Sequence, residues 1–105
     1  MMKVEITPFA QQQWRKQMRK CEELFGKNVV KKVTNVLIEK IARLSKFPEM
    51  GYPEPLLANR PQRFRSIIIQ EHYKFIYTII DNKIQILDFW DMRMNPETLQ
   101  RRIKN

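Results

Sequence analysis

The sequence contains a single cysteine, Cys21, and a single histidine, His72. One cysteine cannot form an internal disulfide, and it is compatible with a reducing compartment. One cysteine and one histidine also cannot complete a structural zinc site without carboxylate ligands. We therefore expect no disulfide framework and no metal site.

Long apolar segments are also missing. No run approaches the roughly 18 apolar residues that a membrane-spanning helix needs, and residues 1–5 lack the apolar region of a secretory signal. These absences predict a cytoplasmic protein with no membrane partner. The length of 105 residues predicts one domain over residues 1–105, in which any site lies on a face or in a shallow groove.

Positive charge, in contrast, is in excess. Lys and Arg number 20 against 11 Asp and Glu, which gives a formal net charge of +9. Such an excess favours polyanionic partners, namely RNA, DNA or an acidic protein. A merely basic, soluble surface is the alternative interpretation.

The first half of the chain predicts one strand and a helical hairpin. Residues 3–6 alternate in polarity, and Thr7 and Pro8 then form a typical helix start, with Thr7 as the N-cap. Apolar residues at spacings of three and four form one stripe up to Gly26, which ends the first helix, and a second stripe after Asn28, which can cap the next. The second helix ends before the proline-rich residues 48–61, which predict an irregular loop.

The second half predicts three strands and a short helix. Residues 64–70, 73–80 and 83–90 form an antiparallel meander, with Asp81 and Asn82 as a hairpin turn. Alternation puts Tyr73, Phe75, Tyr77 and Ile79 on one face of their strand. In the next strand it puts Ile84, Ile86, Asp88 and Trp90 together, opposite Leu87 and Phe89. Asn95 and Pro96 begin a C-terminal helix with Leu99 and Ile103 facing inward.

These elements predict an α+β fold in the order strand, helix, helix, three strands, short helix. The helical hairpin packs on one face of an antiparallel sheet, because each apolar stripe needs a partner surface. We expect the other face of the sheet to stay partly open, and a partner to bind there.

Four segments in matching order and with matching gaps resemble the RelE/ParE toxin superfamily over nearly the whole chain. They are residues 44–51 (LSKFPEMG), 63–65 (RFR), 72–77 (HYKFIY) and 84–93 (IQILDFWDMR). The resemblance implies a toxin of a type II toxin–antitoxin system, neutralised by an antitoxin encoded beside it. The net charge of +9 independently favours an acidic antitoxin segment.

The first hypothesis for the toxin is a RelE-like endoribonuclease that cuts messenger RNA on the ribosome without metal or cofactor. Attack of a 2′-hydroxyl on the adjacent phosphate needs a proton acceptor, cations and a proton donor. Arg65 and Arg93 match positions where RelE-like enzymes place cations, and Lys74 matches one that commonly carries arginine. We expect these three to converge on the open face, with His72 as a further catalytic candidate because histidine exchanges protons near neutral pH.

Two other hypotheses remain. Ile67 and Leu99 stand where RelE-like enzymes carry a further cation and a C-terminal aromatic. Missing catalytic groups fit a ParE-like toxin, which binds DNA gyrase without catalysis. The third possibility is a degenerate, non-toxic interaction module. The candidate residues for binding nucleic acid or another target are Arg63, Trp90, Met92, Arg101 and Arg102.

Overall fold

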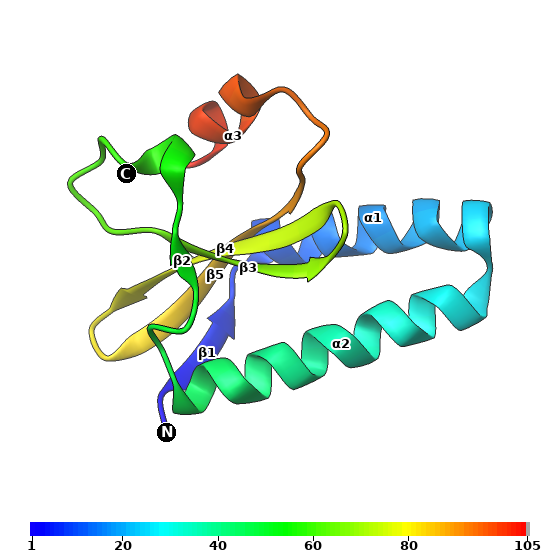
Figure 1. Ribbon diagram of the computed structural model, residues 1–105, viewed down its shortest axis with the longest axis horizontal. Helices are drawn as coiled ribbons and strands as arrows, with labels where there is room; N and C mark the ends of the chain where they lie inside the picture. Colours follow the sequence, from blue (N-terminus) through cyan, green and yellow to red (C-terminus); the bar gives the residue numbers. More distant parts are fainter. Residues whose placement is uncertain (105) are drawn as a thin grey trace.

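The computed structural model describes residues 1–104 of the protein (Figure 1). Its helices and strands follow the predicted order, with two short additions in the proline-rich loop. They are β1 (Lys3–Ile6), α1 (Pro8–Phe25), α2 (Lys27–Lys46), β2 (Tyr52–Pro53), the 3₁₀ helix η1 (Pro55–Leu57), β3 (Arg65–Gln70), β4 (Tyr73–Ile80), β5 (Lys83–Asp91) and α3 (Pro96–Arg102).

The strands form one sheet in the order β1-β5-β4-β3-β2. The predicted antiparallel meander of β3, β4 and β5 is confirmed, and β2 adds to its edge. β1, however, runs parallel to β5, so the sheet is mixed rather than antiparallel. A parallel pair needs a long connection, and the chain between β1 and β5 supplies it.

The predicted helix and turn signals are confirmed with one exception. Thr7 caps α1, and its side-chain oxygen accepts a hydrogen bond from the Ala10 N–H at 3.2 Å. Asp81 and Asn82 both adopt positive φ in the hairpin turn. The prediction that Asn28 caps α2 is wrong, because α2 begins at Lys27 directly after Gly26. Gly26 has φ +89° and serves both helices, a conformation that suits glycine.

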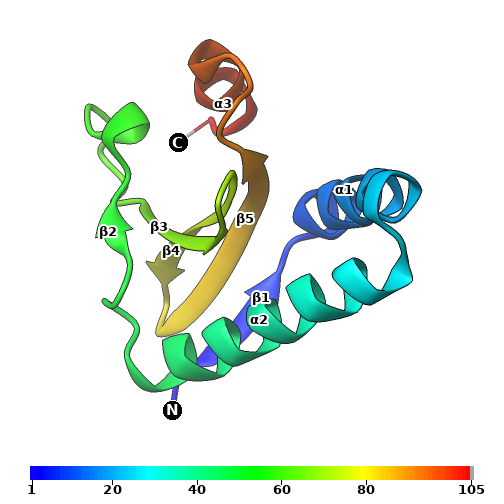
Figure 2. The same cartoon turned by 45° about the vertical axis from the view of Figure 1, so that its right-hand side comes forward.

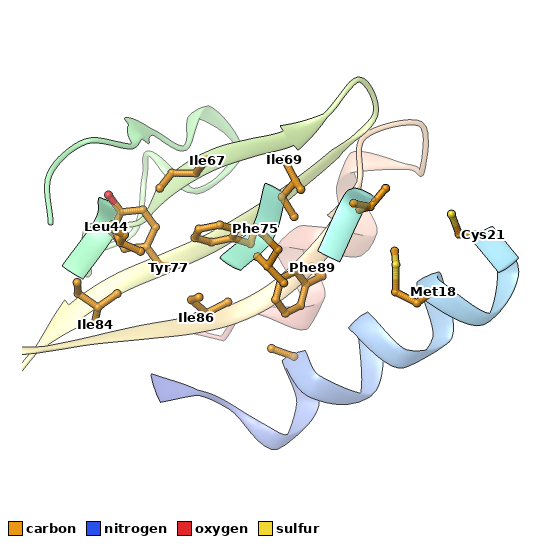
Figure 3. Close-up of a cluster of buried hydrophobic side chains, with 13 residues drawn as sticks. Met18, Cys21, Leu44, Ile67, Ile69, Phe75, Tyr77, Ile84, Ile86 and Phe89 are labelled. Atoms are coloured by element: carbon orange, nitrogen blue, oxygen red, sulfur yellow. The ribbon is translucent and has the colours of Figure 1, made fainter. Parts of the chain in front are cut away.

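The larger core lies between the helical hairpin and one face of the sheet (Figure 3). Phe75 and Tyr77 of β4 point toward Leu44 of α2 and toward Ile84 and Ile86 of β5, and all five side chains are fully buried. The Tyr77 hydroxyl donates to the Pro48 carbonyl at 2.7 Å and accepts from the Gly51 N–H at 3.0 Å. The core therefore also anchors the loop that follows α2.

A β-bulge changes the faces of β5. Ile76 pairs with Asp88 whereas Tyr77 pairs with Ile86, so Leu87 is an extra residue. The predicted alternation is therefore wrong beyond Ile86. Phe89 joins the helix-facing core, while Asp88 and Trp90 lie on the opposite face.

That opposite face is covered, which corrects the expectation of a partly open sheet. η1 and α3 lie over it, on the side away from the helical hairpin (Figure 2). They form a second core, which consists of Leu57, Phe64, Ile76, Trp90, Leu99 and Ile103. The cover is needed because Ile76 of β4 would otherwise expose an apolar surface to water.

This packing predicts unequal effects of one substitution at two leucines. Leu99→Ala should lower the free energy of unfolding by about 2–5 kcal/mol, because Leu99 is 0% exposed between α3 and the sheet. Leu24→Ala, on the 63% exposed α1 position, should change it by less than about 0.5 kcal/mol. Urea denaturation followed by circular dichroism measures both. Equal effects would show that α3 does not cover the sheet.

Candidate functional site

Arg65 braces the loop after α2. It pairs across the sheet with Tyr77, so it lies on the helix-facing side. Its Nη1 donates to the Gly51 carbonyl at 2.6 Å and to the Glu49 carbonyl at 3.2 Å. The Arg65 guanidinium is therefore occupied by backbone carbonyls.

Lys74 lies on the other face, where it pairs with Ile68 and Trp90. It is 6% exposed, and its ammonium forms an ion pair with the buried carboxylate of Glu54. Glu54 also accepts hydrogen bonds from the Ser66 hydroxyl at 2.6 Å and from the Leu56 N–H at 3.0 Å. Burial raises the pKa of Glu54, but these bonds and Lys74 outweigh burial and hold it below its usual value.

Arg93 is fixed by Asp91 at the end of β5. Its Nε and Nη2 donate to the two carboxylate oxygens of Asp91 at 3.0 and 2.9 Å, a bidentate pair. Nη2 also lies 3.4 Å from the hydroxyl of Tyr73. Hydrogen bonding from Arg93 lowers the pKa of Asp91.

His72 and Arg93 line the same hollow, which has a volume of about 350 Å³. We call it the His72–Arg93 hollow. It lies between the distal part of the helical hairpin and the β3–β4 turn, and it is also lined by Tyr73 and by apolar helix residues that include Cys21 and Phe25. Tyr73 is half-buried in the wall of this hollow.

The predicted convergence of Arg65, Lys74 and Arg93 is therefore wrong. Arg65 and Lys74 lie on opposite faces of the sheet, and Lys74 is buried. The physical reason is strand alternation combined with the cover that α3 and η1 provide. Of the four catalytic candidates, the structure brings only His72 and Arg93 into one hollow, and their catalytic roles stay predictions.

The predicted target-binding residues also separate. Trp90 is 2% exposed beneath α3, and Met92 packs against the same core, so the expectation that Trp90 forms a contact surface is wrong. Arg102 is largely buried, with its guanidinium carbon 5.2 Å from the ring centroids of both Trp90 and Phe9. Arg63 and Arg101 are exposed.

Asp88 is a buried titratable group whose environment the sequence did not reveal. Its carboxylate is fully buried and lies 3.4 Å from Nε of Arg102. Burial raises its pKa to about 6, although the positive charge of Arg102 opposes the rise. The sequence does indicate that Asp88 is buried, because it is a lone aspartate in the otherwise apolar run Ile86–Trp90. It does not indicate which face Asp88 lies on, because the bulge changes the alternation of β5.

Sequence reasoning also missed Arg60. Its Nη1 donates to the Ile103 carbonyl, and its Nη2 donates to the Gln100 carbonyl at 2.6 Å. Arg60 thus ties the loop before β3 to the C-terminal end of α3. Within residues 1–104, no group of three or more His, Cys, Asp or Glu side chains could hold a metal ion. No helix in the same range is long and apolar enough to cross a membrane.

The strand, the helical hairpin and the three-stranded meander follow the element order that the resemblance to the RelE/ParE toxins predicts. A family model described as the ParE toxin of the type II toxin–antitoxin system, parDE, matches residues 4–96. The chain therefore belongs to the ParE toxin family, which confirms the resemblance predicted from the sequence. Its partner is accordingly an antitoxin.

A solved structure with a TM-score of 0.70 supports this fold. The chain is similar to a structure described as the chromosomal ParDE TA system from P. aeruginosa, with a TM-score of 0.70 and 18% identity over 87% of this chain and 96% of that one. A second similar structure is the YoeB dimer from Staphylococcus aureus, with a TM-score of 0.47 and 26% identity over 83% and 92%. No curated protein sequence matches the chain.

The buried ion pair predicts that Lys74 is needed for stability. Lys74→Ala should lower the free energy of unfolding by about 3–5 kcal/mol, because it leaves the Glu54 carboxylate buried without its cation. The double variant Glu54→Gln/Lys74→Met should recover most of the loss, since it buries no charge. Urea denaturation measures both, and a Lys74→Ala variant of unchanged stability would contradict a buried pair.

The two aspartates of β5 predict opposite pH dependences. The pKa of Asp88 is about 6 in the folded state, above its usual 3.8, so its buried charge destabilises the fold at pH 7–8 and the penalty is removed as the pH falls through 6. Asp88→Asn should therefore stabilise the protein at pH 8, by up to about 3 kcal/mol, because a tenfold change in proton affinity corresponds to about 1.4 kcal/mol. The gain should shrink toward pH 4.

Asp91→Asn is the matched control. The pKa of Asp91 is lowered in the folded state, so its ion pair stabilises the protein at neutral pH and is lost below about pH 4. Thermal unfolding of both variants from about pH 2.5 to pH 8 tests the two signs, because the Asp91 contribution is lost only below about pH 4. A loss of stability in Asp88→Asn that is equal at every pH would contradict the raised pKa.

Proposed function

We propose that this ParE-family toxin acts by binding DNA gyrase and inhibiting it, without cutting RNA. The observation that carries the proposal is that two of the cations that RNA cleavage would use are already bound to groups within the fold. Arg65 holds two backbone carbonyls, and Lys74 is buried against Glu54. A phosphate transition state needs cations that converge on one accessible point, and these two point to opposite faces.

The exposed surface of the helical hairpin suits a toxin that acts by binding another protein. Exposed apolar side chains stand at several places on the helical hairpin and on the loop that follows it, namely Leu24, Phe25, Ile38 and Phe47. Apolar and aromatic side chains contribute strongly to protein interfaces. Gyrase and its DNA lie in the cytoplasm, so the proposal places the toxin there. The +9 chain should meet an acidic antitoxin segment with fast, salt-sensitive association.

RNA cleavage is the second candidate, and one observation favours it. His72, the one histidine of the chain, lines the same hollow as Arg93. The site of RNA cleavage would then be the His72–Arg93 hollow instead of the open sheet face that the sequence predicts, and Arg93 would supply the cation. Arg93 already binds Asp91 in a bidentate pair, so a phosphate would have to compete with that carboxylate.

The deciding experiment measures both activities of the purified toxin. We expect it to inhibit gyrase supercoiling, and to leave messenger RNA intact in a translating extract. His72→Ala, at an exposed position, should not change the inhibition of supercoiling. Cut messenger RNA with normal supercoiling would contradict the proposal, and an at least hundredfold loss of cutting in His72→Ala would establish the second candidate. If neither activity is present, the chain is a non-toxic binding module.

A further inference from the structure

Two adjoining hollows form a basic groove on the side of the molecule that carries α3. One, of about 440 Å³, lies between η1 and the start of β3, and the other, of about 1000 Å³, extends to the end of α3. Both are lined by residues 60–62, which join them. The cations of this basic groove are Arg60, Arg63, Arg101 and Lys104. Arg65 also lines it, but its guanidinium is bonded to the Gly51 and Glu49 carbonyls on the helix-facing side of the sheet.

The charge of the groove is strongly one-sided. Within residues 1–104, Glu54 is the one carboxylate that lines the groove, and its charge is balanced by the ion pair with Lys74. Four cations, Arg60, Arg63, Arg101 and Lys104, therefore face the groove, with no uncompensated anion among its lining residues within 1–104. Charges that line a concave surface add their fields, so the groove attracts anions more strongly than a flat basic surface does.

The cations of the groove have two different tasks. Arg60 donates to the carbonyls of Ile103 and Gln100, so it fixes the end of α3 while still contributing charge to the groove. Arg63 makes no side-chain hydrogen bond or ion pair with any residue of 1–104, and Arg101 has only a 3.5 Å contact with the Thr98 hydroxyl. Their guanidinium groups are available for a ligand, and a guanidinium matches a phosphate with two parallel hydrogen bonds.

The lining distinguishes between kinds of polyanion. Single-stranded nucleic acid is usually held by exposed aromatic side chains on which its bases stack, and the one aromatic residue of the groove, Phe64, is buried. A protein segment needs apolar anchors, and Leu57 and Ile103 are buried in the second core. What the groove offers is positive charge and forked donors, which suit a regular phosphate backbone.

We propose that the basic groove binds the phosphate backbone of double-stranded DNA, mainly through Arg63 and Arg101. The choice of DNA over RNA rests on the proposed function, because gyrase holds a DNA duplex beside any protein bound to it. The toxin then contacts both the enzyme and its DNA. Binding should be independent of base sequence, since phosphate contacts carry no sequence information.

The test measures the affinity of the full-length protein for a fluorescent 20-base-pair DNA duplex at several salt concentrations. The groove variant is Arg63→Gln/Arg101→Gln. The matched control is Arg15→Gln/Arg19→Gln, which removes the same charge from exposed positions of α1. A third variant, Arg63→Lys/Arg101→Lys, retains the charge. Circular dichroism confirms that each variant is folded, and all substituted positions are exposed.

We expect the groove variant to bind the duplex about tenfold or more weakly, with a salt slope smaller by about 2, because each phosphate contact contributes about 0.9 to the slope. The control and lysine variants should stay within about threefold of the unchanged protein. Equal losses in the groove and control variants would overturn the proposal, since attraction would then be diffuse. Equal or tighter binding of single-stranded DNA, of an RNA duplex or of a polyglutamate peptide through the same residues would also overturn it.

Gyrase inhibition by the same variants separates this inference from the proposed function. Supercoiling inhibited by a protein that shows no groove-dependent DNA binding would leave the proposed function intact and remove the inference. Groove-dependent DNA binding without inhibition would support the DNA site and remove gyrase as the target.

Discussion

Strand β4 buries both of its faces, and the rest of the molecule depends on this constraint. Phe75 and Tyr77 on one face and Ile76 on the other are fully buried. A strand at the centre of the sheet that is apolar on both sides needs two covering layers. The helical hairpin supplies one, and η1 with α3 supplies the other. The covered second face in turn removes Lys74 and Trp90 from any surface site.

The positive charge of the chain has two roles. Arg60, Arg65 and Arg102 are occupied within the fold, where they hold carbonyls or a buried carboxylate. Arg63 and Arg101 lie exposed along one groove. The net charge of the chain is therefore larger than the number of cations that a partner can reach would suggest. Of the three cations that the resemblance placed in a catalytic centre, Arg65 donates to backbone carbonyls, Lys74 is buried against Glu54, and Arg93 is paired with Asp91.

Local signals were enough to predict most of the fold. The caps at Thr7 and Asn95, the break at Gly26 and the turn at Asp81 depend on neighbouring residues only, and they are confirmed. The site could not be predicted in the same way, because the exposure of Lys74 depends on Glu54 and on the distant cover by α3. A one-residue bulge leaves no signature in a pattern of alternating residues, so the faces of Asp88 and Trp90 were assigned wrongly.

The bulge in β5 also affects how the sheet meets other chains. β1 pairs with Lys83–Ile86, so beyond the bulge no strand of residues 1–104 lies beside this edge of β5. The side chain of Gln17 reaches over from α1 and donates to the Phe89 carbonyl at 2.6 Å, on the stretch that would otherwise accept a foreign strand. The unpaired N–H and C=O groups of an exposed strand edge can pair with another chain and lead to aggregation. A bulge together with a side chain that binds one of these groups hinders such pairing. A basic toxin can thereby keep a short first strand without becoming a template for self-association.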